Sequence, residues 1–218
     1  MGVSSLQRTT DAATTAGGAV LGAAFRVAGA VRPTRKPLHP RGRVTTARLV
    51  RRGLTPPVGV EFLDTARVDE VLVRESRSVG LPGPLPDING LAVRVTEPDG
   101  SVGDLLFATS GWGRLTRYVL TASRTTYGRP MTTLFPYRSS AGAVLLGVRS
   151  TGRGSLQLAC TVAGGPWRPF GELTIGDAEG DPEVSFDPVL NQVPGLEQYA
   201  AITRLREPAY RGARHSRD

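Results

Sequence analysis

Apolar and polar positions alternate along this chain in short runs, a period typical of β-strands. In the first half these runs are Arg43–Val50, Val71–Arg77 and Leu91–Thr96, and Asp99-Gly100 after the third is a strong hairpin signal. The second half contains further runs at residues 131–138, 143–150, 155–163 and 166–176. Segments rich in glycine and proline separate them. The pattern predicts about seven or eight short antiparallel strands, and their spacing fits a closed or nearly closed barrel.

Three segments favour helix instead. Residues 12–31 are mostly small and apolar and are followed by Pro33 and Pro37, which end a helix. A mid-chain helix is expected from about Arg114 to Arg124, and another in the C-terminal segment. We therefore expect a mainly β protein (α+β) with N-terminal, mid-chain and C-terminal helices. A polar tail and small-residue helix occupy residues 1–32 and a single barrel domain spans residues 33–218.

The composition agrees with a barrel of many turns. The chain has 218 residues, of which 39% are hydrophobic, with 27 glycines and 17 prolines. Its net charge of +8 comes almost entirely from arginine, since Lys36 is the only lysine. The arginines are spread along the chain, aromatic residues make up 6%, and no DNA- or RNA-binding motif stands out. We therefore expect no nucleic-acid partner.

The cysteine count and the N-terminal segment bear on the compartment. Cys160 is the only cysteine, so the sequence predicts no disulfide framework, no cysteine metal site and a cytoplasmic location. Arg26 interrupts the apolar run of residues 12–31, which is too short and too rich in small residues for a membrane span. A weak membrane contact through residues 12–31 and a homo-oligomer both stay open.

The candidate chemistry is concentrated near the C-terminus. Tyr210 has Arg206 four residues before it and Arg217 seven after it, offsets that share one face of a helix. Nearby positive charge lowers the pKa of a phenol, and a phenolate oxygen is a suitable ligand for ferric haem. Pro208 lies between Arg206 and Tyr210 and predicts an interruption of that helix. The structural alternative is an arginine-rich tail helix whose tyrosine only packs.

The same segment resembles the proximal haem segment of the monofunctional haem catalases. The matching residues, in order, are Phe186, Pro188, Pro194, Gly195, Arg206, Tyr210 and Arg217. The resemblance covers roughly residues 35–218, is weak over residues 111–165, and indicates a minimal or truncated member. It implies a catalase-like eight-stranded antiparallel barrel that binds haem b, with Tyr210 as the ligand of the ferric iron. Arg206 would hold the phenolate and Arg217 would bind a haem propionate.

A second part of the resemblance supplies the other face of the haem. His39, three residues before Gly42, is similar to the distal histidine of catalases, and Val73-Arg74-Glu75-Ser76 matches a second family motif. The resemblance implies that His39 and Ser76 are catalytic and that Lys36 and Arg74 bind propionates, although lysine lacks the bidentate geometry of arginine. In a strand, Arg74 and Ser76 point to the same face. The structural alternative is an edge strand with solvated polar residues.

One departure from the family pattern concerns peroxide. The position of the distal asparagine holds Ala108, and Thr109 or Ser110 is the candidate for supplying a hydroxyl instead.

The sequence thus favours a haem-dependent oxidoreductase, a peroxidase or weak catalase that reduces hydrogen peroxide or organic hydroperoxides with an unknown electron donor. The alternative is a haem-free barrel that binds a lipid or other small molecule or serves as a scaffold.

Overall fold

The computed structural model describes residues 42–78, 85–152, 154–179 and 184–215. All of them belong to one compact unit that spans residues 37–218. The predicted N-terminal tail and helix, and the candidate site residues Lys36, His39 and Arg217, lie outside the described residues.

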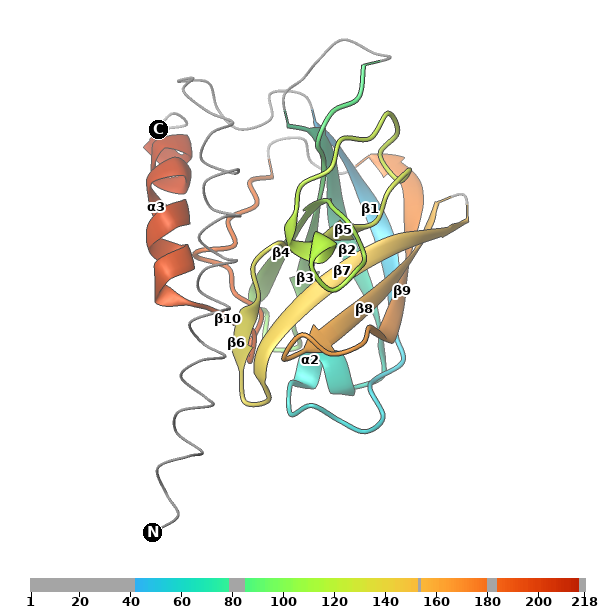
Figure 1. Ribbon diagram of the computed structural model, residues 1–218, viewed down its shortest axis with the longest axis vertical. Helices are drawn as coiled ribbons and strands as arrows, with labels where there is room; N and C mark the ends of the chain where they lie inside the picture. The colour runs from blue at the N-terminus through green and yellow to red at the C-terminus, as the bar shows by residue number, and fades with distance from the viewer. Residues whose placement is uncertain (1–41, 79–84, 153, 180–183, 216–218) are drawn as a thin grey trace. The chain divides into compact units, whose positions relative to one another are not determined.

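Eight antiparallel strands close into a barrel in the described part of the chain, in the order β7-β5-β4-β3-β2-β1-β9-β8, with β8 paired back to β7 (Figure 1). The strands are β1 (Gly42–Arg51), β2 (Arg67–Arg77), β3 (Asn89–Thr96), β4 (Val102–Thr109), β5 (Met131–Thr132), β7 (Gly142–Gly152), β8 (Ser155–Val162) and β9 (Arg168–Glu179). Two short strands, β6 (Tyr137–Ser139) and β10 (Glu197–Gln198), extend the sheet beside β7. The predicted mainly β barrel is confirmed.

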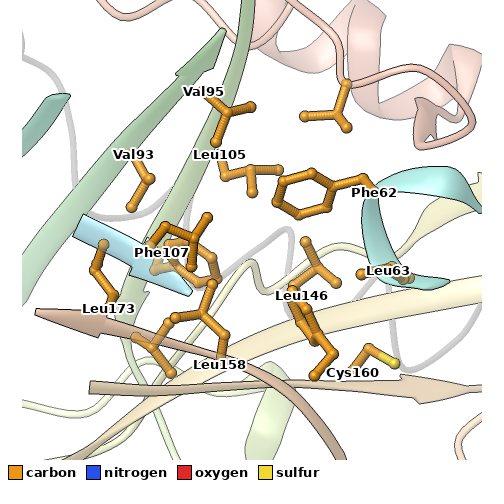
Figure 2. Packing of buried hydrophobic residues seen from close by; sticks show 14 of the residues in the cluster. Phe62, Leu63, Val93, Val95, Leu105, Phe107, Leu146, Leu158, Cys160 and Leu173 are labelled. Atoms are coloured by element: carbon orange, nitrogen blue, oxygen red, sulfur yellow. The ribbon is translucent and has the colours of Figure 1, made fainter. Parts of the chain in front are cut away.

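The inside of the barrel is filled by the apolar positions of the alternating strands. Val73, Val93 and Leu158 have no exposed surface or almost none, and Leu105 and Leu146 are each 1% exposed. Figure 2 shows Val93, Leu105, Leu146 and Leu158 in the same core cluster as Phe62 and Leu63, which come from the short helix α2 (Glu61–Asp64). The Phe62 ring also packs edge to face on Phe170, with ring centroids 5.9 Å apart. Burial of this apolar surface is the main stabilising contribution to the fold.

The predicted mid-chain helix is wrong. Between β4 and β5 the chain forms only the 3-10 turn η1 (Thr116–Tyr118) and otherwise turns and irregular backbone. A bridge between Ser110 and Leu120 closes the segment into a loop. Leu115 is 73% exposed, so the apolar periodicity of this stretch does not mark a buried helical face.

The predicted single strand over residues 131–138 is also wrong. Leu134 has a left-handed backbone (φ 59°), and this break divides the run into β5 and β6. A non-glycine residue in this region costs conformational energy. Buried neighbours on both sides hold it in place, since Thr133 donates its N–H to the carbonyl of Leu146 at 3.0 Å.

The C-terminal helix is confirmed as α3 (Ala200–His215), but the predicted interruption at Pro208 is wrong, because α3 continues through Pro208. Proline removes one backbone hydrogen bond from a helix. The residues around it remain helical, and α3 is anchored in its first turn by Ile202, which is 3% exposed.

The thiol of Cys160 is predicted to be unreactive in the folded protein. It points into the barrel with no exposed surface, and burial raises the pKa of its thiol to about 11. Because the thiolate is the reactive form, a thiol-specific chromogenic reagent should not react with the native chain near neutral pH. In denaturant it should titrate one thiol per chain. Rapid reaction without denaturant would mean that the barrel opens between β7 and β8.

Candidate functional site

The outer face of β1–β4 presents three rows of residues that run across the strands. Strand register aligns Gly42, Ser76, Gly90 and Ala108 in the first row, Val44, Arg74, Ala92 and Leu106 in the second, and Thr46, Leu72, Arg94 and Asp104 in the third. The first row contains only small side chains. This part of the outer face is therefore flat enough for a planar ligand to approach the backbone.

Arg74 and Ser76 share this face, as the alternation of the strand predicts. The guanidinium of Arg74 lies over Gly42, where an added Cβ would come within 2.6 Å of its Nε. The hydroxyl of Ser76 lies over Gly90, where an added Cβ would come within 2.9 Å of its Oγ. Burial lowers the pKa of Arg74. A cation and a hydroxyl are thus set side by side on a floor of glycine and alanine.

An ion pair closes the third row. Arg94 donates from Nε and Nη2 to the two carboxylate oxygens of Asp104, each at 2.7 Å. The Asp104 side chain has no exposed surface. Its Oδ2 also accepts from the backbone N–H of Asp187 at 2.7 Å and from Nδ2 of Asn191 at 2.8 Å. This bidentate, charge-assisted pair ties residues 185–191 to the outer face of β3 and β4.

The segment that leads to α3 is held by turns that its sequence dictates. Gly195 has φ +78°, a conformation that suits glycine, and Leu196 donates to the carbonyl of Val193 at 2.9 Å to close the Pro194-Gly195 turn. The Phe186 ring lies under the guanidinium of Arg94, 5.1 Å from its Cζ. The matched residues of this segment therefore position the start of α3 and do not themselves supply chemistry.

On α3, Ile202, Arg206 and Tyr210 follow one another at intervals of four, so they lie on one face. Arg206 stacks its guanidinium over Phe135 at 5.4 Å. Burial raises the pKa of both Tyr137 and Tyr210, and the charge of Arg206 opposes that rise. Asp187 and Asp104 also act electrostatically on Tyr210, so its phenol lies within electrostatic range of the Arg94–Asp104 pair. Tyr210 and Arg206 are thus brought together beside the outer face of the barrel.

The expectation of a lowered phenol pKa is wrong in direction. Burial raises the pKa of Tyr210 to about 12, and the opposing effect of Arg206 is smaller. The free-energy cost of removing a phenolate from water is larger here than its stabilisation by the partly buried Arg206 cation. At neutral pH the phenol therefore keeps its proton.

Both hydroxyls next to Ala108 are buried and hydrogen-bonded within the protein. Thr109 points inward and donates its hydroxyl to the carbonyl of Thr121 at 2.7 Å. Ser110 is buried and shares a hydrogen bond with Thr132 at 3.1 Å. In the first row, the described residue that carries a polar side chain is Ser76.

Sequence reasoning missed the roles of Arg94, Asp104 and Asn191. The Asp99-Gly100 signal predicts the hairpin, but a two-residue turn there would place Arg94 opposite Leu105, whereas the observed register places it opposite Asp104. Asn191 gives no comparable signal, since it reaches Asp104 across a separation of 87 residues.

Two features are absent from the described residues. No cluster of three or more His, Cys, Asp or Glu side chains is placed to hold a metal ion. None of the helices in the described ranges is long and apolar enough to cross a bilayer.

Comparison with known proteins identifies the fold. No family model and no curated protein matches the sequence. Among solved structures, catalase A from Saccharomyces cerevisiae matches with a TM-score of 0.58 at 11% identity, over 90% of this chain and 63% of that one. A fungal catalase matches with a TM-score of 0.55 at 12% identity, over 82% of this chain and 58% of that one. The chain has a catalase-like fold. At such low identity the likeness concerns the fold alone, and the chain spans about three fifths of those catalases.

Proposed function

We propose that the chain binds a ferric haem against the outer face of β1–β4, with Tyr210 as its iron ligand, and acts as a hydroperoxidase of the peroxidase or weak catalase type. One observation carries the proposal. In a catalase-like barrel, Tyr210 and Arg206 lie together on one face of α3, near the Arg94–Asp104 pair of that outer face.

The described residues fit a haem in shape and charge. The small residues Gly42, Gly90, Ala92 and Ala108 keep this part of the outer face low, and the guanidinium of Arg74, which lies over Gly42, is suited to a propionate. A half-buried phenol beside an arginine suits a ferric ion, because that ion stabilises the phenolate. By resemblance, Lys36 and Arg217 supply further positive charge to the propionates.

A bound ferric haem would supply the two-electron chemistry that reduces a peroxide bond. Tyr210 would give up its phenol proton to hold the iron, and Arg206 would stabilise the resulting phenolate. By resemblance, His39 would accept the hydroperoxide proton and return it to the leaving oxygen, and Ser76 would orient the imidazole. Since Ala108 offers no amide to polarise peroxide, we expect slow dismutation and favour turnover with an electron donor.

Replacing the proposed ligand should reduce haem binding strongly. Tyr210→Phe keeps the ring and removes the oxygen, so we expect hemin affinity to fall by more than about 100-fold, beyond the usual loss for a residue that only supports a ligand. The measurement is a titration with hemin followed by the Soret band, which should saturate at one haem per native chain. Tyr199→Phe, which removes a phenol just before α3, is the matched control and should bind normally. Equal binding by Tyr210→Phe and the native chain would refute the assignment.

The raised pKa adds a second readout to the same titration. Because Tyr210 holds its proton up to about pH 12, ligation as phenolate at lower pH must release that proton. We expect the native chain to release one more proton per bound haem than Tyr210→Phe. This contribution should raise affinity about tenfold for each pH unit between about 7 and 9. Equal proton release by the two proteins would contradict tyrosinate ligation even if haem binds.

The alternative is a haem-free barrel that binds another small molecule or a protein. A ligand inside the barrel is disfavoured, because packed side chains such as Val93 and Leu158 fill the described interior. A haem-free function would therefore also use the outer face. Failure of the native chain to bind hemin at all would favour this alternative.

A further inference from the structure

The net charge of the protein comes from one continuous stretch. Between Asp104 and Glu172 there is no acidic residue. Eight of the 27 basic residues lie there. The other 19 basic residues are balanced by the 19 acidic residues of the chain. These eight are Arg114, Arg117, Arg124, Arg129, Arg138, Arg149, Arg153 and Arg168. The formal charge of +8 thus belongs to the segment from the end of β4 to the start of β9.

The loop between β4 and β5 lies over the outside of β7 (Figure 1). It carries Arg114 and Arg117 of this stretch. Trp112 from this loop stacks on Trp167, with ring centroids 4.1 Å apart and planes inclined by 16°. Trp167 donates its Nε1 hydrogen to the carbonyl of Trp112 at 2.8 Å. Both rings press on Gly147, where an added Cβ would come within 2.8 Å of each. The 111–120 loop is therefore fixed rigidly to the barrel.

Arginines cover both outer faces of the tryptophan pair. The Arg117 guanidinium lies 4.9 Å from the Trp167 ring and that of Arg149 lies 5.7 Å from the Trp112 ring. Arg117 is 2% exposed and donates to the carbonyls of Gly113 and Gly165, each at 3.1 Å. Within the described residues no carboxylate pairs with Arg117. The positive charge of Arg117 in this loop is therefore not neutralised by a described carboxylate.

The surface of the same loop is apolar and basic. Leu115 is 73% exposed and Val119 is 50% exposed, on either side of η1. Arg114 is exposed beside Leu115. Aliphatic side chains that project next to arginines suit the headgroup region of an anionic bilayer, where the aliphatic groups leave water and the guanidinium groups meet phosphates.

We propose that the 111–120 loop docks the protein on the surface of an anionic phospholipid bilayer, with Leu115 and Val119 entering the interface and Arg114 contacting lipid phosphates. A nucleic acid fits this surface less well, because bases need an open aromatic face for stacking and the tryptophan faces are covered by Arg117 and Arg149. The proposal does not depend on haem binding.

The test is co-sedimentation of the native chain with two kinds of vesicle, pure phosphatidylcholine and an equal mixture of phosphatidylcholine and phosphatidylglycerol. We expect binding to the anionic vesicles only, weakened by salt. Leu115→Ser should reduce the affinity about tenfold, and Arg114→Gln about fivefold. The chain has only two tryptophans, both in this cluster. Their emission should therefore change on binding in the native chain.

Two matched variants lie outside the acid-free stretch. Val68→Ser changes an aliphatic residue that is 52% exposed, and Arg52→Gln removes an arginine whose side chain is 75% exposed. Both should bind like the native chain. The proposal is overturned if these controls lose as much affinity as the loop variants, or if neutral vesicles bind equally well. It is also overturned if all variants bind the vesicles normally, or if the loop variants lose affinity only for a single-stranded DNA offered in place of the vesicles.

Discussion

Asp104→Ala is expected to lower the free energy of unfolding by about 3–5 kcal/mol, the usual cost of removing one partner of a buried ion pair. The variant leaves the Arg94 guanidinium without its carboxylate, and it removes the acceptor of two further hydrogen bonds, from Asp187 and Asn191. In a chain of this size the loss corresponds to a fall in melting temperature of about 10 °C. The measurement is urea unfolding followed by far-UV circular dichroism.

The same variant should also weaken hemin binding, because Asp104 holds the segment that leads to Tyr210. Asp104→Asn, which keeps the shape and one acceptor oxygen, should lose less stability and less haem affinity. If Asp104→Ala had the same urea midpoint of unfolding as the native chain, the hydrogen bonds between residues 185–191 and the outer face would contribute nothing to stability. Our account of how α3 is positioned would then be wrong.

Asp69→Ala is also expected to lower the free energy of unfolding by about 3–5 kcal/mol, because it too removes one partner of a buried ion pair. This pair lies away from the candidate site. Asp69 accepts from Nε of Arg51 at 2.8 Å and from Nε of Arg67 at 2.6 Å. The Arg51 side chain is 2% exposed and would keep only the Phe62 carbonyl, at 3.0 Å, and the Phe62 ring. Because these residues lie on the inner face of β1 and β2, the fraction that remains folded should bind hemin like the native chain.

A surface ion pair provides the comparison for both variants. Arg138 and Glu197 approach to 2.6 Å, as close as the buried pairs, but their side chains are 64% and 54% exposed. Glu197→Ala should therefore cost less than about 1 kcal/mol. A large loss in Glu197→Ala, or a negligible one in Asp69→Ala, would show that burial does not set the strength of these pairs. If hemin affinity fell equally in Asp69→Ala and Asp104→Ala, Asp104 would have no specific role in positioning the segment that leads to Tyr210.

The sequence by itself determined the barrel, because strand alternation is a local property that repeats along the chain. Runs such as Arg43–Val50 and Leu91–Thr96 have one apolar face, and that face must be buried against similar strands. The Asp99-Gly100 turn predicted the β3–β4 hairpin as well, whereas the register that pairs Arg94 with Asp104 is seen only in the structure. The shared face of Arg74 and Ser76 followed from the same alternation.

Only the tertiary structure decided the features that depend on distant contacts. Trp112 stacks on a residue that is 55 positions away and fixes residues 111–120 as a loop, although their apolar spacing predicted a helix. The helix around Pro208 continues despite one lost backbone hydrogen bond. The pKa of Tyr210 rises because burial, which no local pattern specifies, outweighs the charge of Arg206. Alternation and turns are set by near neighbours, whereas solvation, stacking and charge pairing depend on which surfaces the closed barrel brings together.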